Sequence, residues 1–253
     1  NGVGKSTLIK CLLGLLKPDS GTAAVFGEDS WNLSAAAKQR IGYVPQTMPG
    51  FRWMKAGTFL DYVGSYYSQW NREKALALMK EWGIEPQMRI SRMSEGEVQK
   101  LSIIRALGHE PDLLVFDEPV ASLDPLARRD FLRQIVELGM DGTRTMIFSS
   151  HIASDLERVA DEIAILKEGV VTWKGELAAL QERIRRIRIQ SGISIPSKNI
   201  VSRKPINLRL SATVCLSAPR LPCYGIVGKS EILAFQQLEK FSLYRAEFPL
   251  QNN

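Results

Sequence analysis

The sequence is poor in cysteine and has no long hydrophobic run. Its three cysteines, Cys11, Cys215 and Cys223, show neither the spacing of zinc ligands nor the paired pattern of a disulfide framework. We therefore expect a protein of a reducing compartment such as the cytosol. No apolar stretch reaches the ~18 residues that indicate a membrane-spanning helix, so the sequence predicts no span.

Acidic residues are scarce only in the last quarter of the chain. Between positions 185 and 253 there are eleven Lys or Arg and three Glu, a net charge of +8, while the whole chain carries +6. The residues before position 185 therefore carry a net charge of −2. Nucleic-acid-binding domains carry a basic patch on the domain itself. We expect no nucleic-acid partner for the main domain.

Helical and strand-like segments alternate over the first 175 residues. Apolar residues at helical spacing predict helices over 6–16, 58–82 (two helices, broken near Asn71), 94–107, 126–138 and 154–160. Short apolar runs predict strands at 23–26, 41–44, 112–116 and 145–150, with two more between 162 and 175. This alternation predicts an α/β fold with a mostly parallel sheet covered on both faces.

Polar residues follow three of these predicted strands. Gln46 comes after 41–44, Asp117 and Glu118 after 112–116, and His151 after 145–150. Ligands of parallel sheets bind at the carboxyl ends of the strands. We expect these four side chains at one site. His109, at the end of a predicted helix, is expected to be exposed and without a catalytic role.

The chain opens with the sequence NGVGKSTLIK. Glycines before a helix let backbone N–H groups surround an anion, and Lys5 and the Ser6 hydroxyl suit phosphates and Mg²⁺. The full motif G-x-x-x-x-G-K-[ST] has a glycine five places before Gly4. We expect the sequence to begin inside this motif. A glycine-containing turn before an ordinary helix is the alternative.

Each of the other polar residues also has a structural alternative. Asp117 would hold the metal and Glu118 would polarise an attacking water, or both would cap the next helix. His151 would bond a γ-phosphate or serve as a structural histidine. Gln46 would be a loop amide without a role, and Asp124 would cap the helix that starts near Pro125.

The order of six motifs resembles the nucleotide-binding subunit of ABC transporters. NGVGKST is similar to the end of Walker A, YVPQ to the Q-loop, RMSEGEVQKLSIIRAL to the signature, LLVFDEP to Walker B, ASLD to the D-loop and SSH to the switch histidine. The resemblance covers Asn1 to about Gly175. It implies a P-loop NTPase fold of the ABC type, with a helical subdomain over about 47–108 that carries the signature.

The resemblance implies ATP and Mg²⁺ as cofactors. Glu118 would be the general base, His151 would contact the γ-phosphate, and Gln46 would touch Mg²⁺ and the attacking water. The metal would be held by Ser6, Gln46 and Asp117. The nucleotide contacts implied are Asn1, Gly2, Val3, Gly4, Lys5, Ser6, Thr7, Ser94, Gly96 and Asp124.

The family pairs two such domains head to tail, so Ser94 and Gly96 would serve the nucleotide of the partner. Here the sequence departs from the usual L-S-G-G-Q, because it reads Met93-Ser94-Glu95-Gly96-Glu97. The acids either point aside in a symmetric homodimer, or weaken the half-site of a heterodimer. The aromatic residue that stacks on adenine in the family would lie upstream of Asn1.

The resemblance implies an ATP-hydrolysing subunit that powers a membrane transporter, with exporter-type ATPases most similar. It would sit on the cytoplasmic face of the membrane through transmembrane permease subunits. A soluble ABC-type ATPase acting on ribosomes and a degenerate subunit of a heterodimer are the alternatives. A DNA-maintenance ATPase is disfavoured, because no heptad run separates Lys5 from Ser94.

The pattern weakens towards the end of the chain. We expect a helical connector over 176–190 and a basic tail or appendage over 191–253. The tail contains scattered Pro, Ser and basic residues without a sustained period. A small β-rich appendage, a partly disordered segment and an out-of-frame tail all fit this composition.

Overall fold

A computed structural model describes residues 4–48, 50–121, 123–139, 144–152, 155, 157, 159–167, 169–189, 200–206, 209–215 and 231–236. Asn1, Gly2 and Val3 lie outside the described residues. So do residues 154, 156 and 158 of the helix expected over 154–160.

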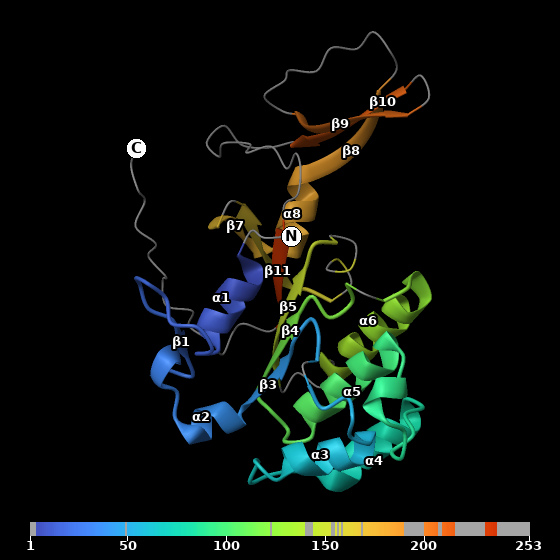
Figure 1. The fold of residues 1–253 in the computed structure, drawn as a ribbon. Helices are drawn as coiled ribbons and strands as arrows, with labels where there is room; N and C mark the ends of the chain where they lie inside the picture. The colour runs from blue at the N-terminus through green and yellow to red at the C-terminus, as the bar shows by residue number, and fades with distance from the viewer. Residues whose placement is uncertain are drawn as a thin grey trace.

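A six-stranded sheet forms the centre of the molecule, in the order β3-β4-β5-β11-β6-β7 (Figure 1). The strands are β3 (Ile41–Val44), β4 (Leu113–Asp117), β5 (Thr145–Ser150), β11 (Glu231–Gln236), β6 (Glu162–Lys167) and β7 (Val170–Glu176). β3, β4 and β5 pair in parallel. β11 is antiparallel to both β5 and β6, so β6 runs in the same direction as β5. The prediction of a mostly parallel α/β sheet is confirmed.

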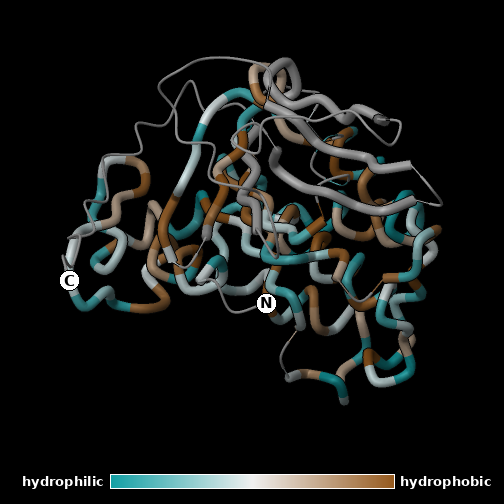
Figure 2. Tube along the Cα trace, turned by 90° about the horizontal axis from the view of Figure 1, so that it is seen from above, coloured by the Kyte–Doolittle hydropathy of each residue, from teal (hydrophilic) through white to brown (hydrophobic). Residues whose placement is uncertain are grey.

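The two faces of the sheet bury different side chains. Along β4, Leu113 and Val115 pack in one cluster with Ile9 of α1 (Lys5–Leu12), whereas Leu114 and Phe116 pack in the other. This separation follows from the two-residue period of a strand. Every residue of β4 and β5 is buried, and both strands have an apolar centre. Figure 2 shows hydrophobic segments running through the middle of the molecule.

Helices cover both faces. α1 lies on one, and α5 (Glu95–Leu107) and α6 (Pro125–Gly139) lie on the other (Figure 1). The remaining short elements are β1 (Ala24–Val25), β2 (Glu28–Asp29), α2 (Ala35–Gln39) and the 3₁₀ turns Ser30–Asn32 and Ile90–Arg92.

The helix break expected near Asn71 is confirmed. α3 (Ala56–Gly64) and α4 (Arg72–Glu81) are separate helices, and the Asn71 side chain caps α4 by accepting from Lys74 N at 2.9 Å. α4 ends beside Gly83, whose φ of +70° suits a residue without a Cβ. α3 and α4 both contact α5, so the three helices form one group.

The expectation that His109 is exposed is wrong. Its ring is buried, stacks on Tyr67 with centroids 4.0 Å apart, and places Nε2 3.1 Å from the Ile41 carbonyl. Because that oxygen can only accept, Nε2 carries the hydrogen. Burial lowers the pKa of His109 to about 4, mainly by penalising the charged ring.

The last part of the chain forms two separate pieces of β-structure. α8 (Leu177–Arg183) is followed by β8 (Ile184–Ile189), so only the first part of the connector expected over 176–190 is helical. β8, β9 (Ile200–Ile206) and β10 (Arg209–Cys215) form an antiparallel sheet in the order β8-β10-β9. β11 instead enters the central sheet, where its backbone satisfies the facing edges of β5 and β6.

Candidate functional site

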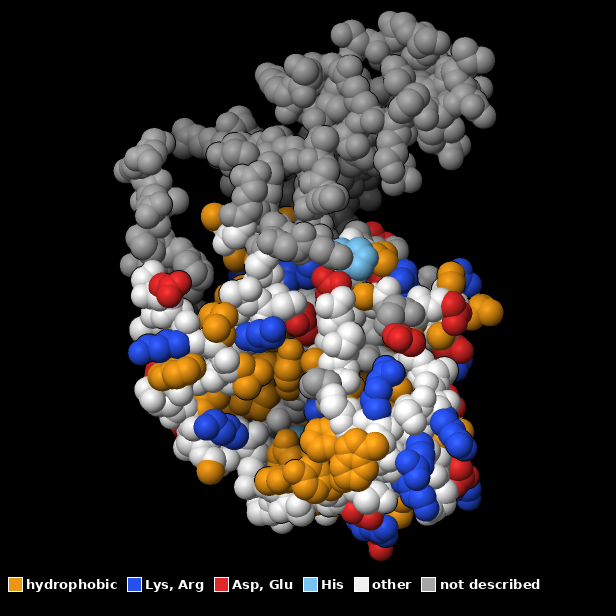
Figure 3. Space-filling model, in the orientation of Figure 1, with side chains coloured by type: hydrophobic (Ala, Val, Ile, Leu, Met, Phe, Trp, Pro, Cys, Tyr) orange, Lys and Arg blue, Asp and Glu red, His pale blue; other side chains and the backbone are white. Residues whose placement is uncertain are grey.

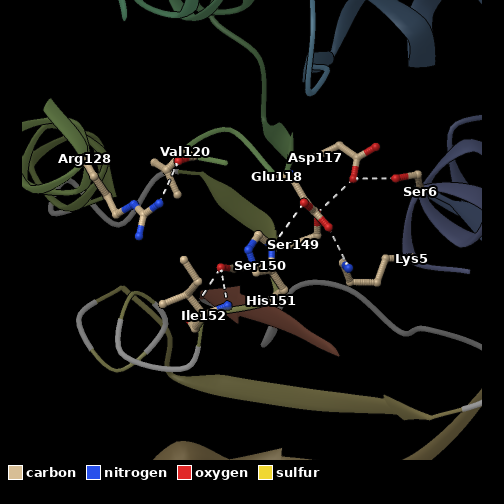
Figure 4. Close-up of polar contacts among 10 residues, drawn as sticks. All are labelled: Lys5, Ser6, Asp117, Glu118, Val120, Arg128, Ser149, Ser150, His151 and Ile152. Atoms are coloured by element: carbon tan, nitrogen blue, oxygen red, sulfur yellow. Dashed lines mark hydrogen bonds and ion pairs between the residues drawn. The ribbon is translucent and has the colours of Figure 1, made fainter. Parts of the chain in front are cut away.

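Polar side chains from three elements meet at the carboxyl end of the sheet (Figure 4). Lys5 and Ser6 begin α1, Asp117 ends β4 and is followed by Glu118, and Ser149 lies near the end of β5. The parallel register sets Asp117 opposite Ser149. The expectation that residues following separate strands gather at one edge holds for β4 and β5.

Asp117 joins Ser6 and Ser149 in one half of this cluster of polar side chains. It is 2% exposed, and its Oδ1 accepts from Ser6 Oγ at 3.0 Å and from Ser149 Oγ at 2.9 Å. A hydroxyl and a carboxylate at the edge of a phosphate site are hard oxygen ligands of the kind that Mg²⁺ prefers. Ser6 and Asp117 therefore fit a magnesium ion that is shared with phosphate.

Glu118 is the centre of the other half. Its Oε1 lies 2.7 Å from Lys5 Nζ, and its Oε2 lies 3.2 Å from His151 Nδ1. Its backbone N–H donates to Ser149 Oγ at 2.8 Å. The carboxylate is thus held between a cation and an imidazole.

The backbone of Glu118 is strained. Its φ is +46°, in the left-handed region that side chains other than glycine rarely adopt. Such strain costs about 1–3 kcal/mol and is concentrated at functional sites. The bond from Glu118 N–H to Ser149 holds this conformation, which directs the carboxylate towards Lys5.

The start of α1 fits an anion. Gly4 is the N-cap, with φ +100° and no side-chain cap, and a Cβ built on it meets nothing within 4 Å. The helix dipole and free N–H groups attract negative charge at this end. Lys5, only 3% exposed, adds a full positive charge. The residues present fit a magnesium-bound polyphosphate.

The structure brings together some of the residues expected at the site and leaves others apart. Gln46 is exposed after β3, and Thr7 is exposed on α1. Asp124 caps α6, accepting from the N–H groups of Leu126 and Ala127. Within the described ranges, no hydrogen bond joins Gln46, Thr7 or Asp124 to the cluster. Their nucleotide roles stay predictions.

Ser94 and Gly96 lie at the start of α5. Ser94 is the N-cap and forms a reciprocal capping box with Glu97. Gly96 is half-buried in the first turn. No hydrogen bond connects either residue to Lys5 or Glu118 in the part of the chain that the structure describes.

Sequence reasoning missed Ser149. This residue is fully buried, accepts from Glu118 N–H and donates to Asp117. The signal was the pair of serines that ends an otherwise apolar strand, since a buried hydroxyl needs a partner. That partner lies on another strand.

The parallel strands, Gly4 and Lys5 at the start of α1, and the two acids after β4 are typical of the P-loop class of nucleotide-binding proteins. The ABC transporter family model matches residues 1–121. The chain is 36% identical over 188 residues to the uncharacterized ABC transporter ATP-binding protein YxlF of Bacillus subtilis, covering 72% of this chain and 61% of that protein. It is 34% identical over 192 residues to the ABC transporter ATP-binding protein NatA of the same species, covering 73% and 77%.

The chain belongs to the family of ABC transporter ATP-binding proteins. It spans 61% of the length of YxlF, so it matches only part of that relative. A solved structure of an ATP-binding subunit of an ABC transporter is also similar, with a TM-score of 0.64 and 28% identity, covering 72% of this chain and 78% of that one. None of the helices described here has the length and apolar character needed to cross a membrane.

Proposed function

We propose that this chain binds ATP with Mg²⁺ and hydrolyses it. The observation that carries the proposal is the cluster in which Glu118 lies between Lys5 and His151, beside the Ser6–Asp117 pair. The metal-bound nucleotide supplies an electrophilic phosphoryl group. The protein supplies charge, position and a base, which is what phosphoryl transfer requires.

Each side chain of the cluster has a distinct task in this proposal. Lys5 binds phosphate oxygens, and Ser6 with Asp117 orients the metal. Glu118 accepts a proton from the attacking water through a carboxylate oxygen, and His151 holds the other oxygen of that carboxylate. Lys5 pairs with Glu118, so a phosphate bound by Lys5 would compete with this pairing and leave the Glu118 carboxylate able to accept a proton.

We also propose that the site is completed by a second subunit. A Cβ on Gly96 would meet only Leu123 Cδ2, at 3.7 Å, an ordinary contact. Nothing described within this chain therefore requires glycine there, although glycine weakens a helix. Close approach by a group from outside the chain gives the residue a purpose. A head-to-tail dimer would bring the phosphate held by Lys5 of one subunit to Ser94 and Gly96 of the other.

An aromatic surface supports a protein partner. Phe51, Trp53, Tyr62 and Tyr66 are 37%, 68%, 40% and 67% exposed. Neighbouring rings touch, with Phe51 and Tyr62 centroids 5.6 Å apart and Tyr62 and Tyr66 centroids 5.4 Å apart. Figure 3 shows a hydrophobic patch in the region of α3, the helix that contains Tyr62. Exposed aromatic clusters favour protein interfaces.

The partner that we propose for this surface is a permease subunit of a membrane transporter, which would place the chain peripherally on the cytoplasmic face of the membrane. The family assignment supports transport. Export is the direction we propose, in line with the Nod factor export ATP-binding protein I of Burkholderia lata, 33% identical over 191 residues. A phosphonates import ATP-binding protein of Treponema denticola, 30% identical over 214 residues, represents the opposite direction.

The test of hydrolysis is Mg²⁺-dependent phosphate release by the purified protein. Glu118→Gln is expected to lower the rate by about 10²–10⁴-fold, the usual contribution of a general base, while ATP still binds. Glu110→Gln is the control, because Glu110 pairs with Lys74 on the surface and should leave the rate unchanged. Full activity in Glu118→Gln would assign the base to another residue, with His151 the first to examine.

A further inference from the structure

The signature serine is already engaged within its own chain. Ser94 N–H donates to Glu97 Oε2 at 2.7 Å, and Ser94 Oγ donates to the same oxygen at 2.8 Å. In return, Glu97 N–H donates to Ser94 Oγ at 3.3 Å. Both donors of Ser94 thus point to one carboxylate oxygen.

A phosphate would need the same donors. Phosphate oxygens only accept hydrogen bonds when ionised, and the serine hydroxyl has a single hydrogen to give. Glu97 holds that hydrogen and places a negative charge beside it. Phosphate docking against Ser94 therefore has to displace the Glu97 carboxylate. The two states of Ser94 exclude one another.

Glu95 provides the internal comparison. It carries the same charge, is exposed, and also lies in the first turn of α5. Among the described residues, no hydrogen bond joins Glu95 to Ser94. Both acids place a negative charge at the start of α5, but of the two only Glu97 accepts hydrogen bonds from Ser94.

We propose that Glu97 is a latch on Ser94 that opposes docking of a partner subunit's nucleotide and so raises the ATP concentration at which the dimer closes. This rests on the proposed function, because it assumes that Ser94 meets the phosphate held by another subunit. Glutamine at position 97 could still accept from Ser94, but its neutral oxygen makes a weaker bond than a carboxylate. The latch thereby sets a threshold for closure of the dimer.

The experiment compares two acid-to-amide changes in the hydrolysis-blocked Glu118→Gln protein. Light scattering measures the ATP concentration that gives half-maximal dimer. Glu97→Gln is expected to lower it about tenfold, the equivalent of ~1.4 kcal/mol. Glu95→Gln is expected to lower it no more than about twofold, since it removes charge near the helix end without freeing the serine.

Stability measured without nucleotide separates the latch from a purely structural cap. Glu97→Gln weakens the capping box, so it should lower the melting temperature while it eases dimer closure. If Glu97 had only a structural role, Glu97→Gln would lower the melting temperature and also raise the ATP concentration needed for dimer formation. Equal shifts in the two variants, or a higher ATP requirement for Glu97→Gln, would overturn the latch.

If ATP produced no dimer at all, the proposed function would be wrong. A third measurement would still test the contact between Glu97 and Ser94. In the nucleotide-free protein, amide exchange at Ser94 reports the Glu97 bond directly. Glu97→Ala should accelerate it about tenfold, and Glu95→Ala should not. Unchanged exchange in Glu97→Ala would show that the serine is not held.

Discussion

Lys5 Nζ and Glu118 Oε1 lie 2.7 Å apart, and both side chains are less than a tenth exposed. The group expected to bind phosphate thus neutralises the group expected to act as base. Removing one partner of a buried pair is costly, because the other charge then has less compensation. The pair also links the start of α1 to the end of β4, far apart in sequence.

Glu118→Gln should therefore destabilise the nucleotide-free protein, by up to about 3 kcal/mol. ATP should recover much of this loss, because phosphate replaces the missing negative charge beside Lys5. Differential scanning calorimetry with and without Mg-ATP measures both effects. Glu110→Gln removes an exposed lysine partner and should change stability by less than about 1 kcal/mol. An ATP-induced shift in Glu118→Gln no larger than that of the unmodified protein would contradict this account of the pair.

Ser149→Ala should weaken both stability and Mg²⁺-dependent nucleotide binding. Its hydroxyl serves Asp117 and the strained backbone of Glu118, so we expect a loss of about 1–3 kcal/mol in unfolding free energy. Ser102→Ala is the matched control. Ser102 is also fully buried, but its Oγ has no hydrogen-bond partner among the described residues. Urea unfolding measures the loss of unfolding free energy in each variant. Equal losses would show that the burial of the serine matters, rather than its hydrogen bonds to Asp117 and Glu118.

His109 should make stability depend on pH. Its pKa is lowered to about 4 in the folded chain, so the unfolded chain takes up the proton first, near pH 6.5. The contribution is fully present above about pH 6.5 and is lost as the pH falls towards 4, a change of up to about 3 kcal/mol. His109→Phe should flatten this part of the profile. An unchanged pH profile in His109→Phe would refute the assignment.

Gly96→Ala should separate folding from assembly. The added Cβ has room within the chain, and alanine is the better helix former by up to about 1 kcal/mol. The melting temperature should hold or rise. ATP-driven dimer formation should fall at least about tenfold, because the approach of another subunit's phosphate is blocked. Glu95→Ala serves as the control. If Gly96→Ala formed dimers at the same ATP concentration as the unmodified protein, the proposed close approach at Gly96 would be wrong.

Local patterns were enough to place most elements. The apolar runs of β4 and β5 and the helix break near Asn71 are each encoded within a few residues, and each is found as predicted. The site was predicted in outline for a similar reason. Once strands are assigned, the rule that ligands bind at their carboxyl ends brings Asp117, Glu118 and His151 together.

Contacts between distant segments were not predictable in this way. The pairing of Lys5 with Glu118 and the bonds of Ser149 depend on strand register, which no local pattern states. His109 was misjudged because its helix end passes beneath Tyr67 and beside Ile41. β11 joins the central sheet through backbone pairing with β5 and β6, and composition alone gives no sign of it.

The central claim is that ATP is hydrolysed at sites shared between two subunits. A mixing experiment tests it most directly, with a Lys5→Ala chain and a Ser94→Arg chain that are each inactive alone. In the mixed dimer both lesions fall on one shared site, because Ser94 of one chain serves the phosphate bound by Lys5 of the other. The second site is intact, so ATP hydrolysis should partly return. No recovery, with mixed dimers demonstrated by differential tagging, would contradict the account.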